Sequence, residues 1–209
     1  MATYVNNLRL KEIATGDESG TWGTSTNTNL ELIADALGTG TEAITTNADT
    51  HTTTVADGSA DAGRAFFLQY TGTLDSTCTI TIAPNTINRV QLIENATSGS
   101  QNIIIKQGSG TTVTIAPGKV SAVQLDGAGS GAGVLDAFTD LQLTDSLTLL
   151  GPVLTIGDAA AEDTKIVFDG NAQDYYVGLD DSADDLVIGL GSAVGTTPAI
   201  IIDESQFVS

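Results

Sequence analysis

Residues 79–92, Thr79-Ile-Thr-Ile-Ala-Pro-Asn-Thr-Ile-Asn-Arg-Val-Gln-Leu92, recur 33 positions later as Thr112-Val-Thr-Ile-Ala-Pro-Gly-Lys-Val-Ser-Ala-Val-Gln-Leu125. The two segments align without gaps and are identical at eight of their fourteen positions. Proline cannot donate to a β-ladder, so Pro84 and Pro117 mark the ends of strands. Each copy is therefore predicted to form a strand, a turn that begins at proline, and a second strand.

An apolar segment precedes each copy of the repeat, at residues 65–70 and 102–106, and each is followed by a glycine-bearing turn. About six strands within 62 residues is a spacing typical of an antiparallel sandwich or a small barrel. Repeats of this length also occur in solenoids, but two copies are fewer than a solenoid needs. We therefore predict a compact antiparallel β-sandwich in residues 62–133, which ends in a flexible glycine-rich hinge at residues 126–133.

Upstream of the predicted sandwich, residues 20–38 contain the only tryptophan, Trp22, and the one segment with clear helical periodicity. Thr28 and Glu31 have the spacing of a capping box, which predicts a short helix over residues 28–37. A left-handed glycine cap at Gly38 would end it. The apolar residues that recur with helical spacing are Leu30, Ile33, Ala34 and Leu37.

A helix of this length needs a surface to lie against, because it is too short to be stable alone in water. One interpretation is that residues 1–61 attach the chain to a larger body. The docking contact would then be made by Trp22, Leu30, Ile33 and Leu37. The other interpretation is that Trp22 and the helix only close a local core. The Thr-, Ala-, Asp- and Gly-rich residues 39–61 are expected to be a loop or an extended arm.

Residues 134–209 are predicted to be a β-rich segment of short strands divided by acidic, glycine-bearing turns. The expected strands are 153–156, 165–168, 175–179, 186–190 and 199–202. These strands are short and poor in aromatic residues, and short hairpins are marginal alone. We expect three copies to place their apolar faces along a common axis as a fibre shaft. The alternative is that this segment folds back onto the sandwich of its own chain.

The net charge of −19 argues against binding to nucleic acid or to an anionic membrane surface, since both need basic residues. The charge is uneven, because residues 120–209 hold one basic and 15 acidic residues. The N-terminus has no basic and apolar signal pattern, and no apolar run is long enough to span a membrane. Cys78, the only cysteine, is expected to be a buried, inert thiol in a chain made in a reducing cytoplasm.

The sequence offers little support for catalysis, for a cofactor or for a metal site. His51 is the only histidine and is expected to be a surface residue. The glycine-rich residues 126–133 lack the GK[ST] ending of a phosphate-binding loop. An acidic cluster lacks the spacing of a calcium-binding loop and is expected to be a solvated turn. Its members are Asp169, Asp174, Asp180, Asp181, Asp184 and Asp185.

Two segments carry a resemblance to a known group of proteins. The run Leu8–Ile33, with its Gly-Thr-Trp-Gly and Asn-Thr-Asn-Leu-Glu-Leu-Ile elements, resembles the start of tail-fibre-like structural proteins of tailed bacteriophages of marine and cyanobacterial type. Residues 169–181 resemble a fibre segment of the same proteins, so the likeness extends to about Ser205. It implies a homotrimeric virion protein of the tail, assembled in the host cytoplasm. Such a protein attaches to other tail or baseplate proteins through its N-terminus and supports host adsorption.

The alternative function is a capsid decoration protein or a carbohydrate-binding adhesin module that contacts a host surface glycan or receptor. A lectin usually exposes aromatic residues that stack on sugars, whereas the predicted loops here contain Gly, Ser, Thr and Asp. The sequence therefore favours a structural virion protein over a binding module. Because apolar residues continue to the last positions, we expect either a short adaptor-like fibre or part of a longer chain.

Overall fold

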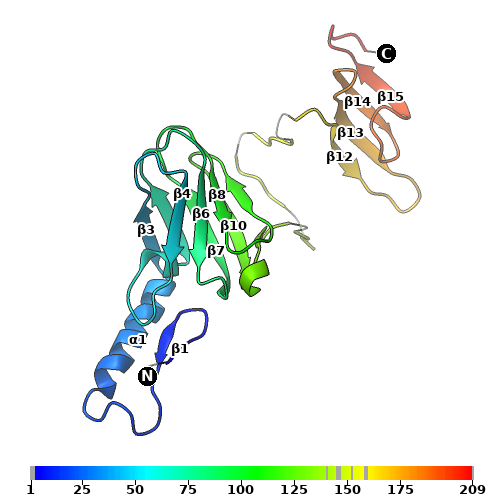
Figure 1. Ribbon diagram of the computed structural model, residues 1–209. Helices are drawn as coiled ribbons and strands as arrows, with labels where there is room; N and C mark the ends of the chain where they lie inside the picture. Colours follow the sequence, from blue (N-terminus) through cyan, green and yellow to red (C-terminus); the bar gives the residue numbers. More distant parts are fainter. Residues whose placement is uncertain (1–2, 140, 145–146, 152, 158–159, 209) are drawn as a thin grey trace. The chain divides into compact units, whose positions relative to one another are not determined.

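The computed structural model describes residues 3–139, 141–144, 147–151, 153–157 and 160–208 (Figure 1). The protein is mostly β, with one α-helix and several sheets in the described residues, which confirms the predicted class. The chain divides into two compact units, residues 1–142 and residues 143–209. Each unit has its own sheets and is described by itself.

Two sheets of the first unit enclose its hydrophobic core (Figure 1). The first sheet has five strands, in the order β11 (Val134–Asp136), β10 (Val120–Asp126), β7 (Asn88–Asn95), β5 (Phe67–Thr71) and β3 (Thr39–Ala43). The second has four strands, in the order β4 (Thr50–Thr54), β6 (Cys78–Ala83), β8 (Ile103–Lys106) and β9 (Val113–Ile115). Cys78 is buried in this core, as predicted.

The chain alternates between these two sheets and so winds as a short solenoid of three coils. The coils are β3 with β4, β5 with β6, and β7 with β8, and successive coils pair in parallel in both sheets. Only β9, β10 and β11 close the ends of the sheets in antiparallel pairing. The prediction of an antiparallel sandwich was therefore wrong. The first coil lies before residue 62, and the three coils share no sequence repeat that would reveal their parallel pairing.

Residues 39–61 contain two strands, β3 and β4, and are not the expected loop or arm. Both segments are rich in threonine, a β-branched residue that favours strands. Each strand finds a parallel neighbour later in the chain, β3 on β5 and β4 on β6. The sheets thus extend on both sides of the expected range 62–133, with β11 at the other end.

The two copies of the sequence repeat do form the predicted strand, turn and strand, as β6–β7 and β9–β10. Both copies cross from the four-stranded sheet to the five-stranded sheet. Their second strands nevertheless turn opposite faces to the core. Gln91 is fully buried and Val90 is exposed, whereas the equivalent Gln124 is exposed and Val123 is fully buried. A shift of one residue in a strand exchanges its two faces, so a residue that is buried in one copy is exposed at the equivalent position of the other copy.

The glycine-rich residues 126–133 form an ordered turn and not a flexible hinge. They contain the short 3-10 helix η2 (Gly129–Gly131) and connect β10 to β11, which are neighbours in one sheet. One carboxylate oxygen of Asp126 accepts hydrogen bonds from the backbone amides of Ala128 and Gly133, both at 3.0 Å. This turn therefore lies inside the first unit, whose boundary follows residue 142.

The second unit contains one antiparallel sheet, in the order β12 (Thr164–Phe168), β13 (Tyr175–Asp180), β14 (Asp185–Leu190) and β15 (Pro198–Ile202). The structure confirms the strands expected near 165–168, 175–179, 186–190 and 199–202. Residues 153–156, also expected to be a strand, belong to none of the sheets that the described residues form.

The N-terminal part of the first unit holds a hairpin, β1 (Thr3–Val5) and β2 (Leu10–Glu12), and the helix α1 (Trp22–Ala36). The helix begins six residues earlier than predicted, so Thr28 lies inside it and does not form a capping box. Its end also differs, because Leu37 takes a right-handed conformation and Gly38 is not in the left-handed region. A short 3-10 helix, η1 (Ala62–Arg64), lies beside β3 and α1.

Candidate assembly surfaces

The helix α1 packs on the first unit through a face that its hydrophobic periodicity does not reveal. Leu32 and Ala36 are its buried residues. One turn before Leu32, the side-chain amide of Asn29 accepts from the Lys11 backbone amide at 3.0 Å and donates to the Lys11 carbonyl at 2.9 Å. The Asn29 side chain thereby pairs with the backbone of β2 as a neighbouring strand would, and it fixes the helix against the hairpin.

The residues predicted for docking lie on the side of α1 next to its packed face, in contact with solvent. Trp22, Leu30, Ile33 and Leu37 are exposed by 62%, 59%, 37% and 80%. At 100° of rotation per residue, these four positions fall within an arc of about 80° on the helix surface. We call them the α1 stripe. Since Trp22 is largely exposed, it does not close a local core, although the helix itself packs locally through Leu32 and Ala36.

A shallow groove of about 500 Å³ adjoins the end of α1. Its walls are mostly small residues, so a partner side chain would meet little steric hindrance there. The residues that line it are Ala34, Asp35, Gly38, Thr39, Gly40, Ala60, Asp61, Ala62 and Ala65.

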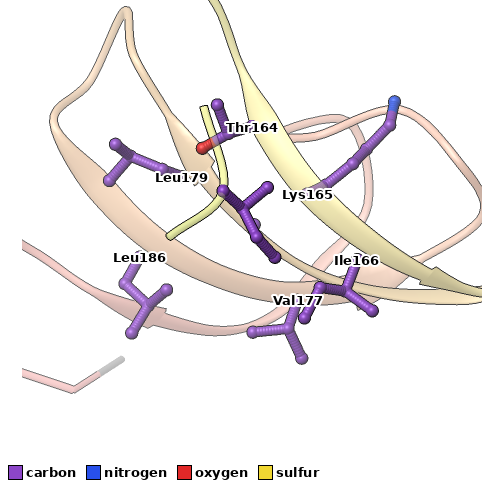
Figure 2. Close-up of a pocket in the computed structure, with 8 residues that line it drawn as sticks. Thr164, Lys165, Ile166, Val177, Leu179 and Leu186 are labelled. Carbon is purple, nitrogen blue, oxygen red and sulfur yellow. The ribbon is translucent and has the colours of Figure 1, made fainter. Parts of the chain in front are cut away.

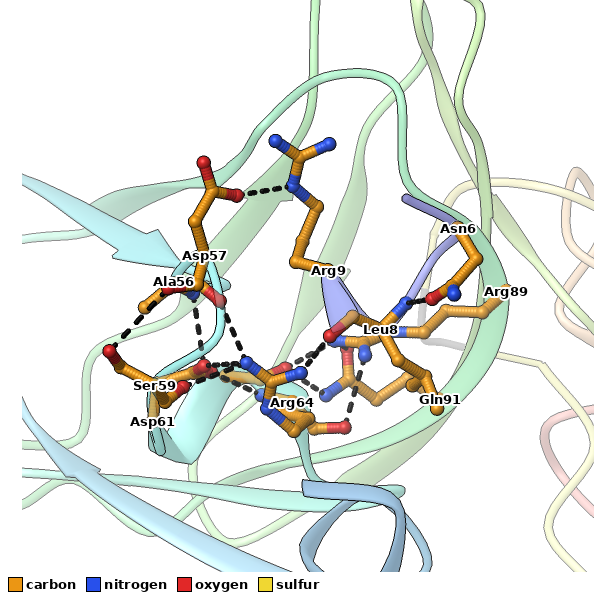
Figure 3. A network of polar contacts seen from close by, with 11 residues as sticks. Asn6, Leu8, Arg9, Ala56, Asp57, Ser59, Asp61, Arg64, Arg89 and Gln91 are labelled. Atoms are coloured by element: carbon orange, nitrogen blue, oxygen red, sulfur yellow. Dashed lines mark hydrogen bonds and ion pairs between the residues drawn. The ribbon is translucent and has the colours of Figure 1, made fainter. Parts of the chain in front are cut away.

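A buried arginine holds the N-terminal hairpin on the sheets (Figure 3). The Arg64 side chain is fully buried and pairs with the Asp61 carboxylate at 2.9 Å. The same guanidinium group donates to the carbonyls of Ala56 and Ser59, both at 2.8 Å, and to the carbonyl of Leu8. Leu8 lies between β1 and β2, so this single side chain joins the hairpin to the loop that follows β4.

A second arginine extends this network toward the five-stranded sheet (Figure 3). Arg89 donates to the carbonyl of Arg64 at 3.0 Å and to that of Gly63. Burial lowers the pKa of Arg89 to about 10, although the nearby Asp61 carboxylate partly offsets this effect. The buried Gln91 amide completes the network, with bonds to the carbonyls of Ala65 at 2.6 Å and Gly63 at 3.1 Å.

A smaller clamp joins the hairpin to the start of α1. The Lys11 ammonium group donates to the Glu18 carboxylate and to the Ser25 hydroxyl, the latter at 3.2 Å. This hydrogen bond lowers the pKa of Glu18 and raises the pKa of Lys11. Together with the arginine network, the clamp gives α1 a fixed platform, so that its exposed stripe is presented by a well-supported helix.

The second unit carries a broader apolar surface on one face of its sheet. Cross-strand partners lie on the same face of an antiparallel sheet, and the register places apolar residues opposite one another across all four strands. We call this surface the open face. It comprises Thr164, Ile166, Phe168, Tyr175, Val177, Leu179, Leu186, Ile188, Leu190, Ile200 and Ile202.

The opposite face of this sheet is covered by its own chain. Tyr176 and Val187 are buried there. The loop between β14 and β15 folds over them, and the Gly195 amide donates to the Tyr176 hydroxyl at 3.1 Å. Gly189 lies under the Tyr176 ring, where a Cβ would approach the hydroxyl oxygen to 2.3 Å. The sheet thus has one closed face and one open face.

A hollow of about 170 Å³ lies at one edge of the open face (Figure 2). Figure 2 shows Ile166, Val177, Leu179 and Leu186 around it. Ile156, from the segment that precedes the sheet, also lines this hollow. Pockets for small-molecule ligands usually measure about 300 Å³ or more, so this hollow is better suited to a single apolar side chain.

His51 and Cys78, the residues considered for catalysis or metal binding, contact other parts of the fold. His51 is not a surface residue. One of its ring nitrogens lies 2.7 Å from a Glu42 carboxylate oxygen, and the ring meets that of Tyr70 edge to face. Burial raises the pKa of the Cys78 thiol, so this cysteine stays protonated. Among the described residues, no three His, Cys, Asp or Glu side chains cluster in a way that could hold a metal ion.

The acidic residues that the sequence groups together are divided between the two ends of the second sheet. Asp169 and Asp174 lie in the β12–β13 connection, whereas Asp181 and Asp184 lie in the β13–β14 turn at the opposite end of β13. Asp180 and Asp185 are direct partners at the β13–β14 turn. Burial raises the pKa of Asp185, and the neighbouring carboxylates of Glu204 and Asp203 add to this effect. Asp180 accepts from the backbone amide and the hydroxyl of Ser182, at 3.2 and 2.7 Å, within the turn.

Comparison of the chain with protein-family models, with curated proteins and with solved structures found no match. In the part of the chain that the structure describes, no helix combines the length and the hydrophobicity needed to cross a membrane.

Proposed function

We propose that this chain is a structural virion protein, a tail fibre of a tailed bacteriophage or the proximal part of one. It attaches to other tail or baseplate proteins through the α1 stripe, forms a homotrimer through its second unit and supports host adsorption. It has no catalytic role and needs no cofactor. The observation that carries the proposal is the exposure of all four apolar residues of the stripe on a firmly anchored helix.

The α1 stripe has the properties of a docking surface. Its four side chains expose about 450 Å² of mostly apolar surface, a size that often marks a functional patch on a soluble protein. Trp22 is the residue type most enriched among the strongest contacts at protein interfaces. The helix is held by Asn29, Leu32 and Ala36, which lie on the face next to the stripe, so a partner can cover the stripe without unfolding the helix.

The proposal is tested by incorporation into virus particles. We would place a tagged copy of the full chain in host cells infected by the phage that carries this gene, and purify the particles by density gradient. A variant with Trp22→Ala, Leu30→Ser and Leu37→Ser is compared with the wild type. Loss of three apolar anchors, at about 1–3 kcal/mol each, is expected to reduce incorporation by tenfold or more.

A matched control keeps the test specific to the stripe. Val120→Ser and Leu135→Ser also remove exposed apolar side chains from the first unit, but at positions far along the chain from α1. The control variant is expected to enter particles as the wild type does. Equal incorporation of the stripe variant would contradict docking through α1. Absence of the wild-type chain from purified particles would contradict the virion proposal and favour an adhesin or another binding module.

A further inference from the structure

We infer that the open face of the β12–β15 sheet is the seam at which further copies of this same chain assemble. The inference rests on the proposed homo-oligomeric fibre and deepens it by naming the surface and its occupant. It is independent of the α1 stripe, which belongs to the other unit.

The first argument is the composition of the open face. Three rows of cross-strand neighbours build it, and the central row runs through Ile166, Val177, Ile188 and Ile200. None of the eleven positions is charged, and ten of them are apolar. Eight of these residues are nonetheless exposed by 36–59%. A solvent-facing side of an antiparallel sheet is ordinarily polar, so this face is built to be covered.

The second unit also lacks a sufficient hydrophobic core without a partner. Tyr176 and Val187 are the only large hydrophobic residues that are buried among the described residues of 143–209. A unit of this size is marginal even with a normal core, and an apolar sheet needs a second layer. The partner must therefore be present whenever the unit folds.

A second copy of the chain meets that requirement, because it is always made together with the first and in equal amount. The eight exposed residues offer about 700 Å² of surface on each copy, close to the roughly 800 Å² per partner of a stable interface. Closed rotational symmetry would bring the same face of each copy to a common axis and cover it on all of them. The segment before the sheet adds to the seam, since Ile156 already lies at its edge.

The charge distribution predicts how this assembly responds to salt. Residues 143–209 contain one lysine and twelve acidic residues, a net charge of −11. No position of the open face is acidic, and Asp180 and Asp185, for example, lie at one strand end. Copies of this unit therefore repel one another while their apolar faces attract. Salt screens the repulsion, so assembly is expected to strengthen between low salt and about 0.5 M NaCl. A basic protein partner would instead dissociate as salt rises.

The inference is tested on the full chain by cross-linking. Ile188→Cys places a thiol at the centre of the open face, and Leu135→Cys places one on an exposed strand of the first unit. The native Cys78 is buried in both variants. With a short bismaleimide, Ile188→Cys is expected to give a covalent dimer as the major product and Leu135→Cys at least tenfold less. Equal yields, or no dimer from Ile188→Cys, would overturn the assignment.

A second pair of variants tests whether the open face is required. Ile188→Lys puts charges at the seam and is expected to reduce the mass by light scattering to that of a monomer, while Val120→Lys keeps the wild-type mass. The thermal transition of the first unit, expected to be unchanged, shows that the chain still folds. A wild-type monomer at about 0.5 M NaCl, or an oligomeric Ile188→Lys variant, would contradict the inference. Failure of the particle test alone would leave this seam intact, so the two proposals fail separately.

Discussion

At the scale of single residues, the structure depends on a buried charge that the sequence does not reveal. Arg64 is one of three arginines, and nothing in its neighbourhood marks it for burial. Asp61, three residues earlier, both pairs with its guanidinium group and accepts from its backbone amide at 2.7 Å. Only the folded chain shows that the carbonyls of Leu8, Ala56 and Ser59 converge on the same side chain.

Replacement of Arg64 by methionine is expected to lower the free energy of unfolding of the first unit by about 3–5 kcal/mol, because it leaves the mostly buried Asp61 carboxylate without the guanidinium group that balances its charge. Urea denaturation of the full chain measures this change. Arg9→Met is the matched control, since Arg9 pairs with Asp57 in a partly exposed position. Its cost is expected to stay below about 1 kcal/mol. Equal costs for the two variants would contradict the role given to Arg64.

The Lys11–Glu18 pair predicts a pH dependence. The pKa of Glu18 lies below its usual 4.5, chiefly because Lys11 donates a hydrogen bond to it. A carboxylate with a lowered pKa stabilises the fold above its unfolded pKa, and this contribution is lost as the pH falls through the lower folded value. The wild type is therefore expected to have a higher melting temperature than Glu18→Gln at neutral pH, and this difference in melting temperature should disappear in acid. A difference that is constant across this pH range would exclude the ion pair as its cause.

At the scale of the elements, α1 shows what periodicity can and cannot predict. Its existence and its apolar face follow from the sequence, but its start and its buried residues do not. Capping preferences predict a start at Thr28, whereas the structure starts the helix at Trp22 because Asn29 and the clamp at Ser25 fix the preceding turn on the hairpin. The spacing of apolar residues predicts the exposed stripe, and its partner remains a proposal.

Two glycines near this helix are expected to respond oppositely to substitution by alanine. Gly23 lies inside α1, and a Cβ added there would have no atom within 4 Å, so Gly23→Ala should raise the free energy of unfolding by about 0.5–1 kcal/mol. At Gly40 in β3, a Cβ would lie 2.5 Å from the Ala62 carbonyl oxygen, and Gly40→Ala should cost about 1–3 kcal/mol. Thermal melts of both variants measure the signs, and a stabilising Gly40→Ala would contradict the packing of η1 on β3.

At the scale of the whole molecule, the sequence predicted the β class and most strands but not the winding. The repeat aligns β6–β7 with β9–β10. Each of these pairs is a connection from the four-stranded sheet to the five-stranded sheet, and the two pairs are not successive coils. The true coils follow one another at 25–29 residues, as in the partners Thr50 and Thr79 or Cys78 and Ile103. They share only buried β-branched and apolar positions, so no identity marks them. Tertiary packing, and not local preference, selects parallel pairing here.

The two units are proposed to have different functions. The first unit has its own buried core of apolar residues from both sheets, so residues 1–142 are expected to fold without the rest of the chain. The second unit carries the open face and is proposed to depend on other copies of the chain. Attachment and self-assembly are thus assigned to separate parts of one chain.

We propose that the second unit drives assembly of the chain, and the mass of the native protein is the direct test of this role. Light scattering after size exclusion in about 0.5 M NaCl would be made on the full chain and on residues 1–142. We predict a mass of three times 21.3 kDa, which is 63.9 kDa, for the full chain and a folded monomer for residues 1–142. A full chain that elutes as a folded 21.3 kDa monomer, or a truncation that remains trimeric, would contradict it.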